Sequence, residues 1–280
     1  MTDYPFKVVD VFTDKPLFGN PVAVVFNADD ISDENMQRIA GWTNLSETTF
    51  ICASTRADYR LRIFTPGREL PFAGHPTIGS AHAALETDVV SKEKRSFTQD
   101  CLSGLIPIQT DPAGVIKARV PKPRLIPTDV TGEMIRPIMG ARTWLDPMLI
   151  DVGPHWLVTR LKDFDALYEL DVDAPKLVDL SREIDAAGMT VYAVDKRNTV
   201  HVRAFAPGDG VFEDPVCGSG NAAVAAHVNA TRLYEQVGKA YTARQGAALG
   251  RDGHIQVAIE GDEVFIGGHS TTVVDGKISL

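Results

Sequence analysis

Two segments of the sequence match each other at a spacing of half the chain. RIFTPG begins at Arg62 and RAFAPG begins at Arg203, 141 residues later in a chain of 280 residues. A second match pairs PFAGHPTIGSAHAA with EDPVCGSGNAA and places His75-Pro and Asp214-Pro 139 residues apart. Self-similarity at a fixed spacing indicates a repeated structural unit. The sequence therefore predicts an internal duplication, in which the two halves of the chain share one fold.

The same order of elements recurs in both halves: two strands, a helix, two strands, a helix and three strands. In the first half, the patterns predict helices over 32–43 and 76–86 and strands over 6–13, 20–27, 48–54, 59–66, 96–102, 105–110 and 115–120. In the second half, they predict a helix over 174–187, a helix opening near Pro215, an extra helical segment, and strands over 148–152, 155–160, 190–194, 199–206, 239–243, 254–259 and 263–266.

These patterns predict two domains of an α+β fold. We expect an N-terminal repeat over 1–120 and a C-terminal repeat over 121–280, with the last strand packing back on the first domain. The proline-rich segment VPKPRLIPTDVTG, 120–132, is typical of an extended connector. The alanine-rich runs GSAHAAL and GNAAVAAHV suit slim helices that a curved sheet buries on all sides.

Charge and cysteine content exclude several functional classes. The formal net charge is -9 and no Lys/Arg cluster is present, which argues against nucleic acid and anionic membranes as partners. Three scattered cysteines indicate a reduced compartment. The N-terminus lacks the pattern of a signal peptide, and no apolar run reaches membrane-spanning length. We therefore expect a cytoplasmic protein.

The polar residues before the two alanine-rich helices point to a binding site for a small carboxylate. A helix N-terminus offers unpaired N–H groups and the positive end of the helix dipole, and glycines let a ligand approach the backbone. His75 and Asp214 precede the helix-opening prolines in the two copies, so we expect them to face each other across a cleft. The alternative interpretation is that each side chain only caps its helix.

Other motifs are less informative. GSGNAA, 218–223, fits a relaxed dinucleotide pattern, but FEDPVC before it is not a buried strand. Ser219 lies in no Gly-x-Ser-x-Gly motif, and neither His-Glu-x-x-His nor Cys-x-x-Cys occurs, so no metal site is expected. His82 and His227 are interpreted as interior helix residues.

Four segments carry a resemblance to a known family: GNPVAVV, NLSETTF, PFAGHPTIG and EDPVCGSGNAA. In this order and along nearly the whole chain, the sequence resembles the PhzF-like phenazine-biosynthesis isomerases. The resemblance implies the diaminopimelate epimerase-like fold, in which two similar halves each wrap a curved, mostly antiparallel sheet around a central helix, with the active site in the cleft between them. It also implies a homodimer that needs neither metal nor organic cofactor.

The resemblance further implies the reaction and the site residues. The characterised reaction is isomerisation of trans-2,3-dihydro-3-hydroxyanthranilate, a proton shift between carbons. Its general acid/base falls on Glu47, supported by His75, Asp214 and Ser219. The substrate carboxylate would bind backbone N–H groups near Gly74, Gly218 and Ser219.

Glu47 has no counterpart in the second half, because the matching position is Gly188. A single acid/base in a duplicated framework suits a residue that takes a proton from one carbon and returns it to another. We expect burial to raise the pKa of such a carboxyl.

Two other functions remain open at this point. The first is an amino-acid epimerase or racemase that uses Cys217, although the aligned residue in the first half is Ile78 and a symmetric pair of thiols is absent. The second is a protein that binds a small carboxylate without catalysis. The motifs describe proton-transfer machinery and leave the natural substrate and pathway open.

Overall fold

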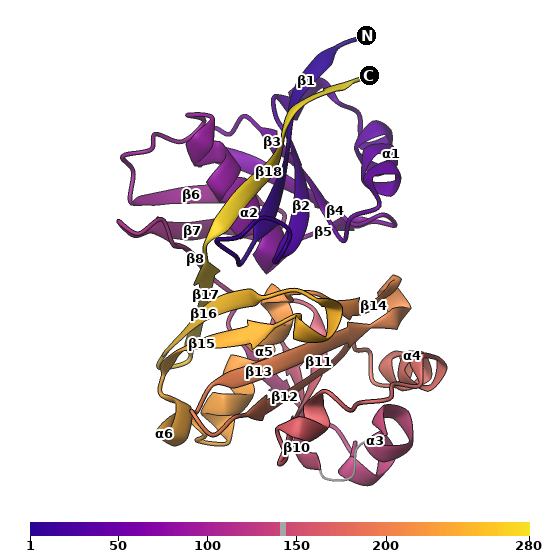
Figure 1. Cartoon of the computed structure of the whole chain (residues 1–280). Coiled ribbons are helices and arrows are strands. Elements are labelled where there is room, and N and C mark those ends of the chain that lie inside the picture. The colour runs from indigo at the N-terminus through magenta and orange to yellow at the C-terminus, as the bar shows by residue number, and fades with distance from the viewer. Residues whose placement is uncertain (141–143) are drawn as a thin grey trace. The chain divides into compact units, whose positions relative to one another are not determined.

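The computed structural model describes residues 1–140 and 144–280 and divides into two compact units (Figure 1). The first unit holds Met1–Arg119 together with Gly267–Leu280, and the second holds Val120–Ile266. The chain therefore leaves the first unit after residue 119 and returns to it for its last 14 residues.

The elements of the first unit follow the expected order. They are β1 (Asp3–Val11), β2 (Asn20–Val25), the 3-10 turn η1 (Ala28–Asp30), α1 (Asp33–Thr43), β3 (Thr48–Cys52), β4 (Tyr59–Phe64), β5 (Glu69–Leu70), α2 (Gly74–Glu86), β6 (Ser96–Cys101), β7 (Gly104–Thr110), β8 (Ile116–Arg119) and β18 (Ser270–Ser279).

A curved sheet surrounds α2 in this unit. The strand order is β18–β1–β2–β3–β4–β6–β7–β8, and all neighbours are antiparallel except β2–β3 and β4–β6. Helix α2 packs against β1, β2, β3, β8 and β18 and is buried along most of its length. In Figure 1, β18 runs beside β1, so the two ends of the chain pair in one sheet.

The second unit repeats this order with additions. Its elements are β9 (Arg124–Ile126), α3 (Gly132–Met139), β10 (Trp144–Asp151), β11 (His155–Leu161), η2 (Asp165–Leu167), α4 (Ala174–Glu183), β12 (Gly188–Val194), β13 (Val200–Ala206), η3 (Pro207–Asp209), β14 (Val211–Asp214), α5 (Gly218–Ala230), α6 (Tyr234–Val237), β15 (Ala240–Gln245), η4 (Ala247–Leu249), β16 (Gly253–Glu260) and β17 (Glu263–Gly268), whose last two residues belong to the first unit.

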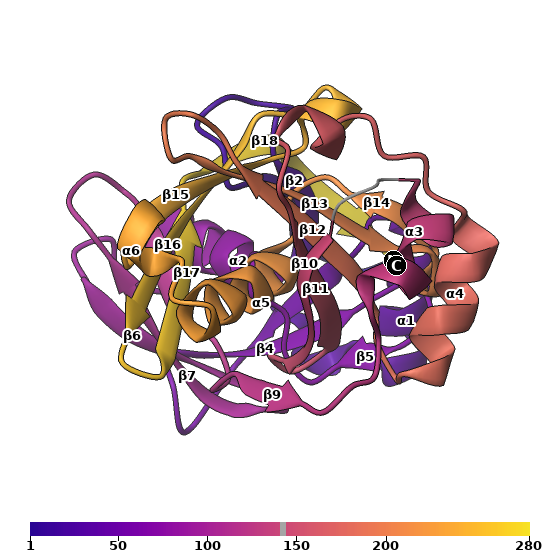
Figure 2. The ribbon, with the colours of Figure 1, turned by 90° about the horizontal axis from the view of Figure 1, so that it is seen from below.

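The sheet of the second unit has the same pattern of directions. Its order is β9–β10–β11–β12–β13–β15–β16, with β11–β12 and β13–β15 parallel and the other neighbours antiparallel. Helix α5 packs against β10, β11, β12 and β16, and Figure 2 shows it enclosed by these strands. The expected fold class, two similar α+β halves each with a curved sheet around a central helix, is confirmed.

The duplication extends to side chains. Arg62 on β4 makes a two-pronged ion pair with Glu69, at 2.8 and 2.7 Å, and lies over the phenylalanine two residues later. Arg203 on β13 pairs with Glu213 in the same way, at 2.9 and 2.7 Å, and also covers the phenylalanine two residues later. Such planar, two-bonded pairs fix geometry as well as charge, so they show which residues of the two copies correspond.

This correspondence corrects the sequence alignment before the two central helices. Strand pairing places Leu70 opposite Ile63 in the first unit and Asp214 opposite Ala204 in the second. Asp214 therefore corresponds to Leu70, and His75, in the first turn of α2, corresponds to Ser219 in the first turn of α5. The expectation that His75 and Asp214 occupy matching places was wrong, because the His-Pro and Asp-Pro pairs stand on opposite sides of the helix start.

Several element boundaries also differ from the prediction. Helix α2 begins at Gly74 and α5 at Gly218, so neither begins at its proline. The segment expected to be a connector contains β9, which pairs with β10, and leads into α3. Helix α4 ends at Glu183, and the positive φ of Asp185 turns the chain toward β12. None of the described helices combines the length and apolar character needed to cross a membrane.

Candidate active site

Glu47 lies in the short turn between α1 and β3. Helix α1 ends at Asn44, whose left-handed φ of 52° lets its N–H close on the carbonyl of Ala40. The hydroxyls of Thr43 and Thr48 are 2.7 Å apart across the turn. The carbonyl of Glu47 accepts from the N–H of Ala23, which continues the pairing of β2 with β3. The backbone that carries this carboxyl is therefore fixed at both ends.

The Glu47 carboxyl lies beside the N-terminus of α2. Its Oε2 is 3.4 Å from Nδ1 of His75, whose side chain is 4% exposed, while that of Glu47 is 15% exposed. Gly74 is the first residue of α2 and His75 the second. A carboxylate at this end is favoured by the helix dipole. The first unit thus places the Glu47 carboxyl beside His75 at the start of α2, which begins at Gly74.

The second unit has no room for an equivalent of Glu47. Thr48 pairs with Phe64, and Met189 pairs with Phe205, so Thr48 corresponds to Met189 and the residue before it is Glu47 in one copy and Gly188 in the other. A Cβ on Gly188 would lie 2.0 Å from the carbonyl oxygen of Phe205. The duplicated framework therefore admits a side chain at only one of the two positions.

The segment Asp214–Cys217, called here the α5 entry loop, carries two of the predicted site residues. Oδ1 of Asp214 accepts from the N–H of Val216 at 3.0 Å, a turn closed by an Asp side chain. The residue that caps α5 is Cys217, whose Sγ accepts from the N–H of Gly220 at 3.3 Å. The interpretation of Asp214 as a helix cap is therefore wrong, since the thiol takes that position.

Ser219 is oriented by an aromatic side chain from β11. Its Oγ accepts from the indole N–H of Trp156 at 3.1 Å and lies 3.6 Å from Sγ of Cys217. Trp156 is 4% exposed, so this hydrogen bond fixes the hydroxyl in a largely dry environment. The second unit thus brings together Asp214, Cys217, Gly218 and Ser219. The prediction that this set meets Glu47, His75 and Gly74 in one site stays a prediction.

Sequence reasoning missed Trp156 and Gln245, which both contact the second set. Gln245 bonds to the α5 entry loop through its buried amide. A signal was present, because Ala243 and Gln245 share the inward face of β15, where a polar side chain requires partners. Of the two histidines expected in the interior, His227 lies fully inside the second unit, whereas His82 is only partly buried and contacts Thr272.

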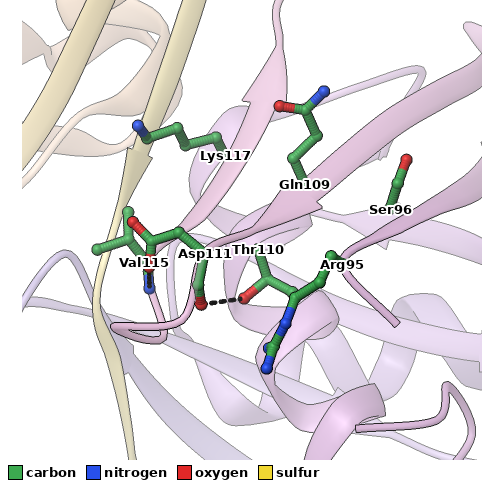
Figure 3. Close-up of a pocket in the computed structure, with 7 residues that line it drawn as sticks. All are labelled: Arg95, Ser96, Gln109, Thr110, Asp111, Val115 and Lys117. Atoms are coloured by element: carbon green, nitrogen blue, oxygen red, sulfur yellow. Dashed lines mark hydrogen bonds between the residues drawn. The ribbon is translucent and has the colours of Figure 1, made fainter. Parts of the chain in front are cut away.

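The cavity in Figure 3 lies in the first unit and contains none of the predicted site residues. It has a volume of about 210 Å³ and is lined by Arg95, Ser96, Gln109, Thr110, Asp111, Val115 and Lys117. The charged ends of Arg95 and Lys117 point away from each other (Figure 3). Asp111 accepts from two N–H groups of its own turn, those of Ala113 and Val115. The lining therefore comes from β6, β7, β8 and the turn between β7 and β8, and the carboxyl of Asp111 is used to close that turn.

Within the described residues, no three His, Cys, Asp or Glu side chains gather as metal ligands would. The groups that can act at the two central helices are a carboxyl beside an imidazole in one unit, and a carboxyl, a thiol and a hydroxyl in the other. These are the side chains of acid/base chemistry.

Comparison with known proteins identifies the family. The model of the phenazine biosynthesis-like protein family, PhzC-PhzF, matches residues 9–276, and the chain belongs to this family. Antisense-enhancing sequence 1 of Schizosaccharomyces pombe is 37% identical over 99% of both chains. A trans-2,3-dihydro-3-hydroxyanthranilate isomerase of Pseudomonas aeruginosa is 33% identical over 98% of this chain and 99% of its own length.

Solved structures agree with this assignment. The phenazine biosynthesis protein of the PhzF family from Bacillus anthracis superposes with a TM-score of 0.88 at 26% identity, over the whole of both chains. The resemblance noted from the four sequence segments is thereby confirmed, and the protein is a PhzF-like isomerase.

Proposed function

We propose that this enzyme moves a proton between two carbons of a small carboxylate substrate, with Glu47 as the general acid/base and without a cofactor. The observation that carries the proposal is the placement of Glu47 beside His75 at the start of α2, with Oε2 3.4 Å from Nδ1. The duplicated position holds Gly188, which has no space for a second carboxyl. One acid/base residue then serves both halves of the reaction.

The proton balance of the reaction is simple. The carboxylate of Glu47 takes a proton from one substrate carbon, and the electrons of the broken C–H bond delocalise over the conjugated substrate. The protonated carboxyl then returns the proton to a different carbon of the same molecule. The imidazole of His75, held in the first turn of α2, orients the carboxyl between the two steps.

The substrate carboxylate is proposed to bind the N–H groups that begin α2 and α5, near Gly74, Gly218 and Ser219. Both helices start with glycine, so a ligand can approach the backbone, and both helix dipoles favour an anion. This requires the two sets of residues to contribute to one site. Asp214, which accepts from the N–H of Val216, and Ser219, which accepts from the indole of Trp156, would then complete the polar lining.

The substrate class is proposed from the relatives. Three of them, from Pseudomonas species, are named trans-2,3-dihydro-3-hydroxyanthranilate isomerase. A cyclic amino carboxylate with an activated C–H bond fits both that name and the two helix N-termini. We further propose a cytoplasmic homodimer: the location follows from the three scattered cysteines, and the dimer from the family resemblance. Light scattering of the purified protein tests the dimer.

The experiment offers trans-2,3-dihydro-3-hydroxyanthranilate to the enzyme in heavy water, beside analogues in which an amide or a hydrogen replaces the carboxylate. Nuclear magnetic resonance follows both rearrangement and deuterium at carbon. Rearrangement that needs the carboxylate supports the proposal. Equal turnover of the amide analogue would remove the role of the helix N-termini, and binding without rearrangement of any compound would favour a non-catalytic protein.

One observation favours an epimerase as a second candidate. Cys217 caps α5 with its Sγ 3.3 Å from the N–H of Gly220, which places a thiol at the positive end of the helix dipole. The corrected alignment places Ala73, the residue before α2, at the equivalent position, so a second thiol is absent there. Replacing Cys217 with Ala separates the two candidates: an epimerase loses deuterium exchange at the substrate α-carbon, and the proposed isomerase keeps its rearrangement.

A further inference from the structure

Gln245 ends β15 beneath the α5 entry loop, and its side chain is almost fully buried, with the residue 3% exposed. Its Oε1 accepts from the N–H of Cys217 at 3.1 Å and from Nδ2 of Asn221 at 2.7 Å. Its Nε2 donates to the carbonyl of Asp214 at 2.8 Å. One amide thus joins both ends of the entry loop to the first turn of α5.

The orientation of this amide is determined by its partners. A backbone N–H can only donate and a carbonyl can only accept, so Oε1 must face Cys217 and Nε2 must face Asp214. Asn221, itself 1% exposed, donates from Nδ2 to the carbonyl of Cys217 as well, at 2.9 Å. These hydrogen bonds join Gln245, Asn221 and the entry loop in one network, which holds the loop in a single arrangement.

Two glycines next to Gln245 bring the backbone against the same loop. Gly246 has a φ of +96°, and a Cβ there would lie 2.7 Å from the carbonyl oxygen of Pro215. A Cβ on Gly253, at the start of β16, would lie 2.4 Å from Cγ2 of Val216. The middle of the entry loop is therefore held by close packing, while Gln245 holds its two ends.

We propose that Gln245 is a positioning residue for the reaction: its amide sets the place of Asp214 and of the first turn of α5, which carries Ser219. The inference rests on the proposed function, since it assigns a role within the same site. The hydrogen bonds of Gln245 go to backbone groups of Asp214 and Cys217 and to the side chain of Asn221, and not to the proposed acid/base Glu47. Its influence on the reaction is geometric, and small displacements of catalytic groups are costly.

Two variants test this role, because the loss of kcat should depend on pH in one of them and not in the other. In Gln245→Glu, the introduced carboxylate faces the Asp214 carbonyl and repels it, but the protonated carboxyl donates there as the amide did. Burial raises the pKa of such a carboxyl. We expect kcat to fall about tenfold to a hundredfold at about pH 8 and the ratio of variant to wild-type kcat to recover toward about pH 5.5. In Gln245→Met the loss is the same at both pH values, because no donor returns.

A second readout does not depend on activity. Cys217 is 4% exposed and its N–H is one of the groups that Gln245 fixes. Alkylation of Cys217 by iodoacetamide, followed by mass spectrometry, should be at least about fivefold faster in Gln245→Met, since local opening exposes the thiol. The matched control is Gln99→Met. Gln99 is a fully buried amide of the first unit that bonds Tyr59 and Thr77, so it loses comparable hydrogen bonds without touching the entry loop.

The outcomes separate this inference from the proposed function. If the wild type does not rearrange trans-2,3-dihydro-3-hydroxyanthranilate, the proposed function fails for that compound. In that case the rate of Cys217 alkylation by itself tests the role of Gln245. Faster alkylation in Gln245→Met but not in Gln99→Met supports positioning. Unchanged alkylation, equal acceleration in both variants, or a pH-independent loss of kcat in Gln245→Glu overturns it.

Discussion

At the residue scale, the sharpest asymmetry between the two halves is Glu47 against Gly188. The strand registers make these positions equivalent, yet a Cβ at Gly188 would collide with the carbonyl oxygen of Phe205 at 2.0 Å. Backbone cannot move aside as the end of a flexible side chain does. The duplicated site therefore keeps one carboxyl for a steric reason that can be measured as stability.

We expect Gly188→Ala to destabilise the protein by about 1–3 kcal/mol, because the methyl group overpacks the start of β12 against β13. Urea unfolding measures this loss. Gly208 lies in the same unit with no atom within 4 Å of an added Cβ, so Gly208→Ala is the matched control and should stay within about 0.5 kcal/mol of wild type. A neutral Gly188→Ala would show that the position is open to side chains.

At the element scale, α5 is joined to its sheet by a buried histidine. The hydroxyl of Tyr192 donates to Nδ1 of His227 at 2.9 Å, and Nε2 of His227 donates to the carbonyl of Asp146 at 2.6 Å. Burial lowers the pKa of His227, against the opposing effect of Asp146, and the charge of Arg160 lowers it further. The histidine is therefore held neutral in the native protein.

This predicts a loss of stability on acidification. A histidine with a lowered native pKa binds fewer protons when folded than when unfolded. Its contribution is complete above the unfolded pKa of about 6.5 and is lost as the pH falls below that value. Urea unfolding at about pH 7.5 and about pH 5.5 should show a smaller difference for His227→Gln than for wild type. Burial also lowers the pKa of His82 and His201, so the variant should retain part of the effect. An unchanged difference would contradict this account.

Most elements follow from the sequence, and the exceptions have physical reasons. The strands with one buried face show clear alternation, as in β4, where exposed Arg60 and half-buried Arg62 alternate with buried apolar residues. Strand β18 does not, because all of its residues are partly or fully exposed. Helix α3 was missed because Pro137 and the prolines before it indicate a connector, although Ile135, Ile138 and Met139 are buried. Helix α2 begins at Gly74, before Pro76. Helix α5 begins at Gly218, after Pro215 and the capping residue Cys217.

The candidate site follows from the sequence only in part. The helix N-termini and Asp214 were visible in local composition, whereas Glu47 emerged only from the family resemblance. A charged residue in a turn is usually solvated. The position of Glu47 beside His75 depends on the pairing of β2 with β3, which a local sequence pattern does not show. Trp156 and Gln245 are reached only through tertiary contacts.

At the scale of the whole molecule, the chain closes the first unit with its own C-terminal strand. Strand β18 pairs with β1 from Asp3–Ser279 to Val11–Ser270, with one register shift after Val8. This leaves β1 with neighbours on both sides, as β9 and β11 flank β10 in the second unit. Strand β18 therefore contributes to the stability of the first unit.

A chain truncated after His269 lacks β18. Strand β1 should then lose its protection from hydrogen exchange, while the second unit keeps its own. We expect hydrogen–deuterium exchange in Asp3–Val11 to rise by at least about tenfold, because its amides lose half of their strand partners. Exchange in β12 and β13 of the second unit should stay as in the full chain. The exposed substitution Val273→Thr is the control for an altered but present strand. Equal deprotection of both units would refute selective closure.

The most direct test of the central claim compares wild type with Glu47→Gln on trans-2,3-dihydro-3-hydroxyanthranilate in heavy water. The exposed acid Glu93, replaced with Gln, serves as the control. We expect rearrangement to fall by at least about a hundredfold in Glu47→Gln, with substrate affinity and thermal stability close to wild type, and to be unaffected in Glu93→Gln. Rearrangement at the wild-type rate in Glu47→Gln would contradict the account and place the proton transfer on another residue.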